Sequence, residues 1–182
     1  MRSVKAVAAT CLAAACVLIE GCVGQSVVGV KASRVRPISA EAGVHPCRFA
    51  ITAIDDRRDD KTLGHPFGTT IRDDGFVDWL SSGLAAIPGH TPSDAHGDAP
   101  VSLRVEILKA YIQQNGSAKS ANVVVRTYAT VDGGPAQIMT YRGVDTSSWN
   151  GMEVEIRRAF NRALADLQLK IGTDLGHACK PT

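Results

Sequence analysis

Hydrophobic and polar residues alternate along four segments of the chain, which predicts four β-strands. The first runs from Arg48 to Ile54, and the second begins at Val101. The third and fourth are expected over 121–131 and 137–144. In the second strand the apolar positions change parity after Ile107, which predicts a β-bulge near Leu108. The short connections between the last three strands favour an antiparallel meander.

Two further segments have the spacing of amphipathic helices. In the first, Asp74 is expected as the N-cap and the helix continues to Ile87. Pro88 follows and ends it, and Trp79 is placed at the edge of the apolar stripe. The stripe consists of Phe76, Leu80, Leu84 and Ile87, with Val77 beside it.

The longer helix is predicted near the end of the chain. Asn150 and Glu153 have the spacing of a capping box, and Gly172 is expected at the C′ position. Its buried stripe consists of Met152, Ile156, Phe160, Ala163, Leu164, Leu167 and Ile171. The element order is therefore β-α-β-β-β-α. We expect an α+β fold, in which an antiparallel sheet of about four strands carries both helices on one face.

The first residues have a different character. A basic stretch through Lys5 precedes an apolar run from Ala6 to Ile19, well short of the roughly 20 residues of a membrane-spanning helix. Gly21 and Cys22 follow, which fits a lipoprotein cleavage site, although Glu20 departs from the usual small or apolar residue. Cys16, preceded by three alanines, is an alternative site.

We therefore expect a signal peptide over 1–21, a lipid-anchored tether over 22–47 and one periplasmic domain over 48–182. Acylation of Cys22, with palmitate among the chains, anchors the protein to the membrane, and Val23 rather than aspartate after the cysteine favours the outer membrane. The mature chain has 182 − 21 = 161 residues and 18 basic against 17 acidic side chains. This balance gives no support to a nucleic-acid partner.

Processing at Cys22 leaves two further cysteines in the mature chain, Cys47 and Cys179. In an oxidising periplasm they are expected to form a disulfide, the alternative being two separate thiols. His45 lies close to Cys47 and superficially suggests a thiolate site, but Pro46 between them and the presence of Cys179 favour the structural bridge.

No motif for nucleophilic catalysis is found, and no cofactor or metal site is expected. His90, Asp94, His96 and Asp98 lie in one loop, but their spacing matches no metal-site pattern and indicates a solvated loop. The charge run from Asp55 to Lys61 has mixed signs, which indicates self-neutralising pairs or a docking edge. Arg157, Arg158 and Arg162 indicate a solvated helix face, or a contact with anionic polymer or lipid.

A candidate protein-binding surface lies on the third strand. Tyr128 falls on the face opposite Val123 and Val125, together with Val124 and Arg126. If that face is open, these three side chains present an apolar, cationic and aromatic surface suited to protein recognition.

The order and spacing of these elements resemble those of the YajG-type bacterial lipoproteins, over the region from Phe49 to Leu175. The matching residues are the cleavage site, Ile54-Asp55-Asp56-Arg57, Leu63-Gly64, the helix over 76–87, Val101-Ser102-Leu103-Arg104-Val105 with Tyr111, and the closing helix. The layout is also similar to that of periplasmic adaptor lipoproteins. The resemblance carries no catalytic residues.

Together these features predict a lipid-anchored envelope lipoprotein on the periplasmic face of the outer membrane. We expect a non-enzymatic adaptor or accessory factor that contacts the membrane through its lipid and an envelope protein through its domain. The alternative is a small-molecule or lipid carrier with a pocket between the helices and the sheet.

Overall fold

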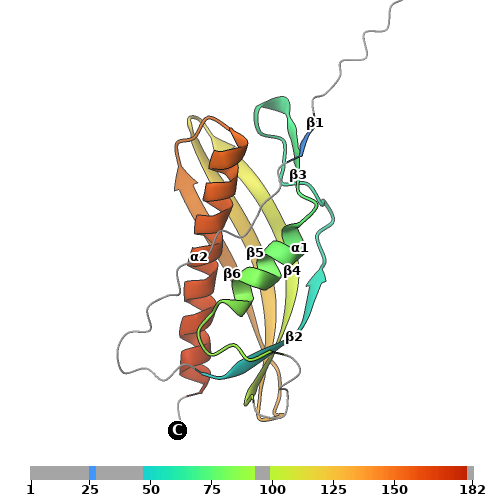
Figure 1. Cartoon of the computed structure of the whole chain (residues 1–182), viewed down its shortest axis with the longest axis vertical. Helices are drawn as coiled ribbons and strands as arrows, with labels where there is room; N and C mark the ends of the chain where they lie inside the picture. The colour runs from blue at the N-terminus through green and yellow to red at the C-terminus, as the bar shows by residue number, and fades with distance from the viewer. Residues whose placement is uncertain (1–24, 28–46, 93–98, 180–182) are drawn as a thin grey trace, which may run out of the picture.

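The computed structural model describes residues 25–27, 47–92 and 99–179 (Figure 1). It contains six strands, two α-helices and a 3₁₀ turn within these ranges. They are, in order, β1 (Gln25–Val27), β2 (Phe49–Asp56), η1 (Pro66–Gly68), β3 (Thr70–Arg72), α1 (Phe76–Ala85), β4 (Val101–Asn115), β5 (Ala118–Val131), β6 (Gln137–Ser147) and α2 (Glu153–Ala178). The four predicted strands and two predicted helices are all present, so the α+β prediction is confirmed.

Four strands form the main sheet in the order β2-β4-β5-β6. The predicted meander is confirmed, because β4, β5 and β6 pair antiparallel. The expectation of an entirely antiparallel sheet is wrong, since β2 pairs parallel with β4, from Phe49 opposite Val101 to Asp56 opposite Ile107. The connection between these strands contains α1, and a helical crossover returns the chain in the same direction. The sheet is mixed.

The predicted bulge is also confirmed. The register between β4 and β5 shifts between Ile107 and Lys109, which leaves Leu108 without a partner. Ile107 and Ala110 consequently both face the core. In a strand without a bulge, residues three positions apart would face opposite sides of the sheet. The bulge therefore lets one strand of 15 residues keep its apolar side chains on the same face.

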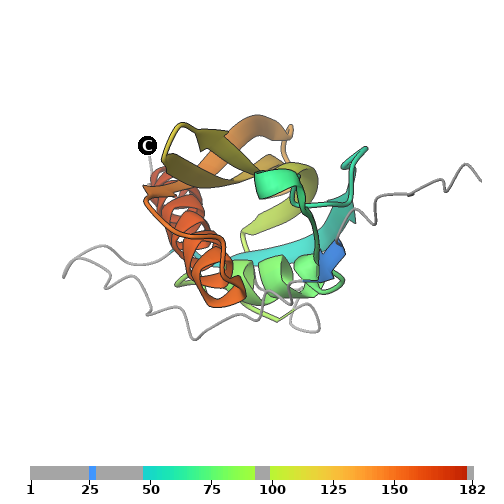
Figure 2. The same cartoon turned by 90° about the horizontal axis from the view of Figure 1, so that it is seen from above.

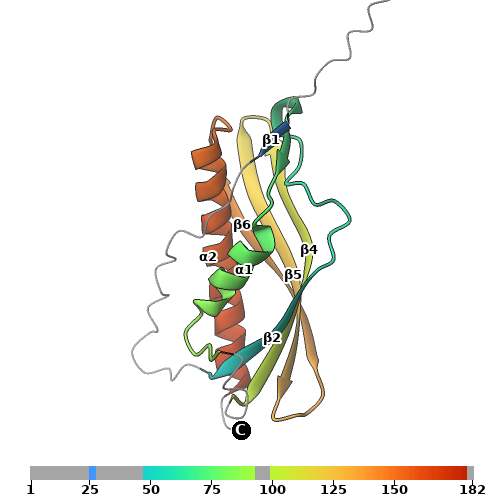
Figure 3. The same ribbon diagram turned by 45° about the vertical axis from the view of Figure 1, so that its right-hand side comes forward.

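Both helices lie on the concave face of the sheet (Figure 2). α2 contacts β5 and β6, and α1 contacts β2 and α2. The core between these layers includes Leu103, Val105, Val123, Val125 and, from the helices, Phe76, Leu80, Phe160 and Leu164. α2 packs closely against the sheet at Gly143, where a Cβ would lie 2.7 Å from Cβ of Leu167. The lower ends of β5 and β6 lean away from α2 (Figure 3).

Three predictions for α1 need correction. The helix ends at Ala85 rather than Ile87, and the other two corrections concern its N-cap and Trp79. The N-cap is Gly75 rather than Asp74, and the side chain of Asp73 accepts the hydrogen bond from its N–H at 3.0 Å. Trp79 is buried, not at the edge of the stripe, because its indole N–H donates to Asn161 on α2 at 2.9 Å. That hydrogen bond satisfies the polar atom of the indole, and the rest of the ring joins the core.

The predicted limits of α2 are also corrected. Glu155, not Glu153, accepts hydrogen bonds from the N–H groups of Met152 and Asn150 at the start of the helix. Gly172 does not end the helix, which continues to Ala178. The last turns bury Leu175 against the sheet, and this packing outweighs the cost of a glycine in a helix.

A second, two-stranded sheet pairs β1 with β3 in parallel. Gln25 lies opposite Thr70 and Val27 opposite Arg72. The range 27–35, where the sequence pattern also predicts a short strand, is described only at Val27, the last residue of β1. β3 is not among the predicted strands, since three residues are too few to establish an alternation.

The structure joins Cys47 to Cys179 in a disulfide, with 5.5 Å between the two Cα atoms. The bridge links Cys47, two residues before β2, to Cys179, the residue after α2. The predicted pairing is therefore present, and it ties together the two ends of the domain over a sequence separation of 132 residues.

Candidate interaction surfaces

The face of the sheet opposite the helices carries the three residues that the sequence singled out. Val124, Arg126 and Tyr128 are all half-buried there. Their neighbours across the sheet are Lys109, Glu106 and Arg104 on β4, and Arg142, Thr140 and Ile138 on β6. The alternation of β5 therefore placed these side chains on the correct face.

Glu106 organises this face. Its side chain is 11% exposed, and it accepts a hydrogen bond from the hydroxyl of Tyr128 at 3.0 Å. The Arg104 guanidinium donates to its other oxygen at 3.1 Å, and the Arg126 guanidinium lies 3.8 Å away. A carboxylate removed from water in this way is stabilised by the surrounding donors. Tyr128 and the two arginines are thus held in one arrangement.

Arg104 extends the network to β2. Its guanidinium donates to Asp55 at 2.8 Å, and this hydrogen bond, together with the nearby carboxylates, raises the pKa of Arg104 above its ordinary value. The same guanidinium lies 5.4 Å from the ring centre of Tyr128, within the range of a cation–π contact. We call Asp55, Arg104, Glu106, Arg126 and Tyr128 the open-face cluster.

An exposed apolar side chain borders the cluster. Ile138 lies opposite Tyr128 across the β5–β6 pair and is 59% exposed. On the other side, Arg142 donates to the buried side chain of Asn122 at 2.6 Å. The surface therefore combines fixed charges, an aromatic ring and an apolar rim, which are the components of a protein-recognition patch.

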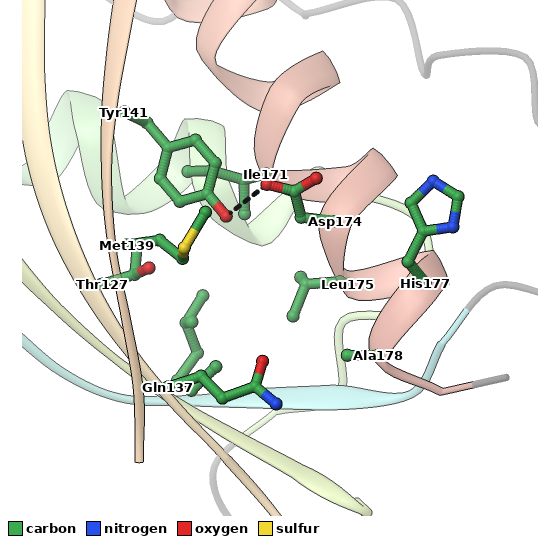
Figure 4. A pocket seen from close by; sticks show the side chains of 11 residues that line it. Thr127, Gln137, Met139, Tyr141, Ile171, Asp174, Leu175, His177 and Ala178 are labelled. Carbon is green, nitrogen blue, oxygen red and sulfur yellow. Dashed lines mark hydrogen bonds between the residues drawn. The ribbon is translucent and has the colours of Figure 1, made fainter. Parts of the chain in front are cut away.

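A groove lies on the concave side, between β6 and the last turns of α2 (Figure 4). Its volume is about 370 Å³ and it is open to solvent. Residues from three strands and one helix line it: Leu103, Thr127, Ala129, Gln137, Met139, Tyr141, Ile171, Asp174, Leu175, His177 and Ala178. Six of these side chains are apolar, and the polar ones include Thr127, which is buried.

One hydrogen bond crosses the groove. The hydroxyl of Tyr141 donates to Asp174 at 2.8 Å (Figure 4). Burial raises the pKa of Tyr141, and the bond to the Asp174 carboxylate raises it further. The Tyr141 hydroxyl therefore keeps its proton at neutral pH and donates it in this hydrogen bond. Asp174 brings negative charge to the groove.

Sequence reasoning missed both the partners of Tyr128 and the groove. Arg104 and Glu106 occupy polar positions of an alternating strand, where charges usually face water. Their meeting with Tyr128 depends on the register between β4 and β5, which the pattern of one strand does not encode. Tyr141 and Asp174 are 33 residues apart, and no spacing rule connects them.

The other candidate residues have separate positions. Cys22, Asp94, His96 and Asp98 lie outside the described residues. His90 packs edge-to-face against Phe49 with 5.5 Å between ring centres, and burial lowers its pKa. Within 25–27, 47–92 and 99–179, no three side chains of the metal-ligating types come together as a metal site. None of the helices described here is long and apolar enough to cross a membrane.

The arginines of α2 are largely paired with acidic side chains. Arg157 contacts Glu153 one turn earlier, and Arg162 donates to Asp145 of β6 at 2.7 Å. Arg158 is exposed. These pairs match a solvated helix face, and the Arg162 pair additionally fixes α2 to the edge of β6.

The charged segment from Asp55 to Lys61 is neutralised partly by pairs within it, as predicted, and partly by β4, where Asp55 accepts from Arg104 and Arg57 lies 4.0 Å from Glu106. Arg58 is buried over the ring of Phe76, with 4.4 Å from its central carbon to the ring centre, and donates to Asp56 at 2.9 Å. Burial alone would raise the pKa of Asp56, but hydrogen bonds from Arg58 and Lys61 outweigh it and lower this pKa from 3.8 to about 2. The pair holds the segment against the start of α1.

Replacing Asp56 by asparagine is expected to lower the free energy of unfolding at pH 7 by about 3 kcal/mol, because Arg58 would become a buried charge without a counterion. Since the folded pKa of Asp56 lies below its unfolded value, the stabilisation is fully present above pH 4 and is lost as the pH falls towards 2. Denaturant titrations from pH 7 to pH 2 measure this. Asp59→Asn, at an exposed carboxylate, is the control. A difference between wild type and Asp56→Asn that does not shrink below pH 4 would contradict the assignment.

No protein-family model matches the sequence, and no curated protein sequence matches it either. Similar solved structures exist. Protein XCC0632 from Xanthomonas campestris, of family DUF330, superposes with a TM-score of 0.58 at 14% identity, over 82% of this chain and 94% of that one. The chain shares the fold of that protein.

Two other bacterial structures are more distant. Protein CT253 from Chlamydia trachomatis gives a TM-score of 0.46 at 10% identity, over 74% of this chain and 99% of that one. A minor lipoprotein from Acinetobacter baumannii gives 0.39 at 11% identity, over 72% and 96%. By structure, then, the chain has the fold seen in a protein of family DUF330.

Proposed function

We propose that the protein is a lipid-anchored, non-enzymatic adaptor of the cell envelope, and that it binds a protein partner through the open-face cluster. The observation that carries this proposal is the network around Glu106. It holds Arg104, Arg126 and Tyr128 in fixed positions on the face of the sheet opposite the helices. Side chains that are ordered before binding lose little conformational entropy when a partner arrives.

The anchor is a separate part of the proposal and rests on the sequence around Cys22. Acylation of Cys22 would attach the protein to the periplasmic face of the outer membrane, with Val23 favouring that membrane. Membership of the YajG-type family belongs to the same proposal. Labelling with a fatty-acid analogue tests the anchor: the wild type should become labelled and Cys22→Ala should not, whereas an unlabelled wild type would contradict it.

The alternative function is a carrier, and the groove beside α2 is the observation that favours it. Binding sites for small molecules have volumes of roughly 300–1,000 Å³ and enclose most of the ligand. At about 370 Å³ the groove lies near the lower limit, and it is open along one side. It has room for one amino-acid side chain or one short hydrocarbon chain, and most of a bound lipid would remain exposed to solvent. The adaptor is therefore the better-supported function.

Truncation of the ring at the centre of the cluster tests the adaptor. Tyr128→Ala is expected to weaken partner binding by roughly 30-fold, since a central aromatic residue of an interface contributes on the order of 2 kcal/mol. The partner is first captured by a photo-crosslinking amino acid placed at position 124 in living cells, and its affinity is then measured with purified proteins.

The matched control is Thr146→Ala, an exposed position near the other end of β6. It should leave the affinity unchanged. A crosslinker at Thr173, on the exposed side of α2, should capture no partner. Equal capture from positions 124 and 173, or an unchanged affinity in Tyr128→Ala, would contradict the proposal that the partner binds the open-face cluster.

A further inference from the structure

The outer edge of β6 is closed over only part of its length. The N–H of Val144 donates to Asp166 at 3.0 Å, and the C=O of Arg142 accepts from Lys170 at 2.8 Å. Both acceptor and donor belong to α2. These two contacts show that the main-chain groups of even-numbered residues in β6 point away from β5.

The same parity applies at the beginning of the strand. In an antiparallel pair, alternate residues direct both main-chain groups to the same side, so those of Ile138 and Thr140 also point outward. No residue in the described part of the chain pairs with them. A free edge of five residues, Gln137 to Tyr141, spans about 17 Å.

The groove borders this free edge. Met139 and Tyr141 point into the groove, whereas Ile138 and Thr140 belong to the opposite face. A strand added beside β6 would therefore place alternate side chains in the groove and the others beside Ile138. Ile138 and Met139 are 59% and 48% exposed, and an added strand would cover both.

The charge in the groove specifies the side chain that fits. Asp174 accepts a hydrogen bond from the Tyr141 hydroxyl through one oxygen, and it forms no ion pair within the described residues. Ile171, Leu175 and Met139 supply apolar walls next to this carboxylate. Lysine and arginine combine an aliphatic stem with a cationic end, which is complementary to such a site.

We propose that the free edge of β6 binds a short extended segment of a protein partner as a fifth strand, with a lysine or arginine side chain in the groove and its cation at Asp174. Main-chain hydrogen bonds to Ile138 and Thr140 supply affinity, and the groove supplies selectivity. β-Branched residues on either side of the basic one lie beside Ile138. The groove lies on the other face of the sheet from the open-face cluster. An experiment can therefore disprove binding at one of these two sites without disproving binding at the other.

Random eight-residue peptides displayed against the purified full chain test the proposal. The enriched peptides are expected to carry a lysine or arginine between β-branched residues. Asp174→Asn should weaken their binding about tenfold, because the buried cation loses its counterion. Thr140→Pro should weaken it by a similar factor, because proline removes an edge N–H at a position that tolerates it.

Two matched variants are controls. Thr146→Pro has the same parity in the half of β6 that α2 closes, and Asp59→Asn removes an exposed carboxylate that does not line the groove. Neither should change the affinity. Amide exchange gives a readout that needs no variant: the N–H groups of Ile138 and Thr140 should exchange rapidly in the free chain and slowly with the peptide bound.

Several results would overturn the proposal. They are the absence of any enriched peptide family, enrichment without a basic residue, and equal binding to wild type and Thr140→Pro. Unchanged exchange at Ile138 and Thr140 in the complex would do so as well. A dimer that dissociates in Thr140→Pro would instead assign the edge to a second copy of the chain.

Discussion

Replacement of Cys47 and Cys179 by serine is expected to lower the free energy of unfolding by about 4–5 kcal/mol. The disulfide closes a loop over a sequence separation of 132 residues, so its loss releases a large conformational entropy in the unfolded chain. Domains of this size have a total stability of about 5–15 kcal/mol. The bridge is therefore expected to supply about a quarter or more of the stability.

Denaturant titrations of the wild type, with and without reductant, and of the double serine variant measure this effect. The reduced wild type and the variant should have the same midpoint, since both lack only the bridge. Reductant should leave the variant unchanged. A midpoint that is equal in oxidised and reduced wild type would contradict the expected contribution.

Substitution of alanine for Gly143 is expected to destabilise the fold by about 3 kcal/mol. A Cβ at this position would collide with the carbonyl oxygen of Ala163 and lie 2.7 Å from Cβ of Leu167. Neither atom can rotate away, because both belong to the core-facing side of α2. The helix would have to move off β6, and the contacts of Leu164 and Leu167 with the sheet would loosen.

Gly176→Ala is the matched control, since it adds the same methyl group to a glycine of α2. Nothing lies within 4 Å of a Cβ there. Because alanine is the better helix former, this variant is expected to be more stable than the wild type by about 0.5–1 kcal/mol. Thermal melts of both variants give the comparison. A Gly143→Ala protein as stable as the wild type would show that α2 does not pack closely against β6 at Gly143.

The same residue explains why a groove exists beside α2. Met139, Tyr141 and Gly143 are successive inward positions of β6. The glycine allows the helix to approach, whereas the two larger side chains border the groove where helix and strand diverge. In β6, two large inward residues followed by a small one thus set the angle at which α2 crosses the strand.

Much of the secondary structure follows from local patterns. The alternation of β4 and β5 predicted which side chains face the core, and the change of parity at Leu108 predicted the bulge. The stripes of α1 and α2 predicted most of their buried faces, since Phe76, Leu80 and Ile156 are buried. The prediction is wrong for Met152, which is the N-cap of α2 and is 56% exposed. Helix ends were predicted less well, because caps at Gly75 and Glu155 depend on how the chain enters the helix.

The sequence by itself determined the periodicities: which residues share a face, where one strand must bulge, and that Tyr128 and Arg126 lie opposite the core. Tertiary structure alone decided that β2 runs parallel to β4, that Glu106 meets Tyr128, and that Asp174 meets Tyr141. The physical reason is that a period is a property of one segment, readable along the chain. Register and packing angle are properties of two segments, and many combinations satisfy the same two patterns until the whole core is assembled.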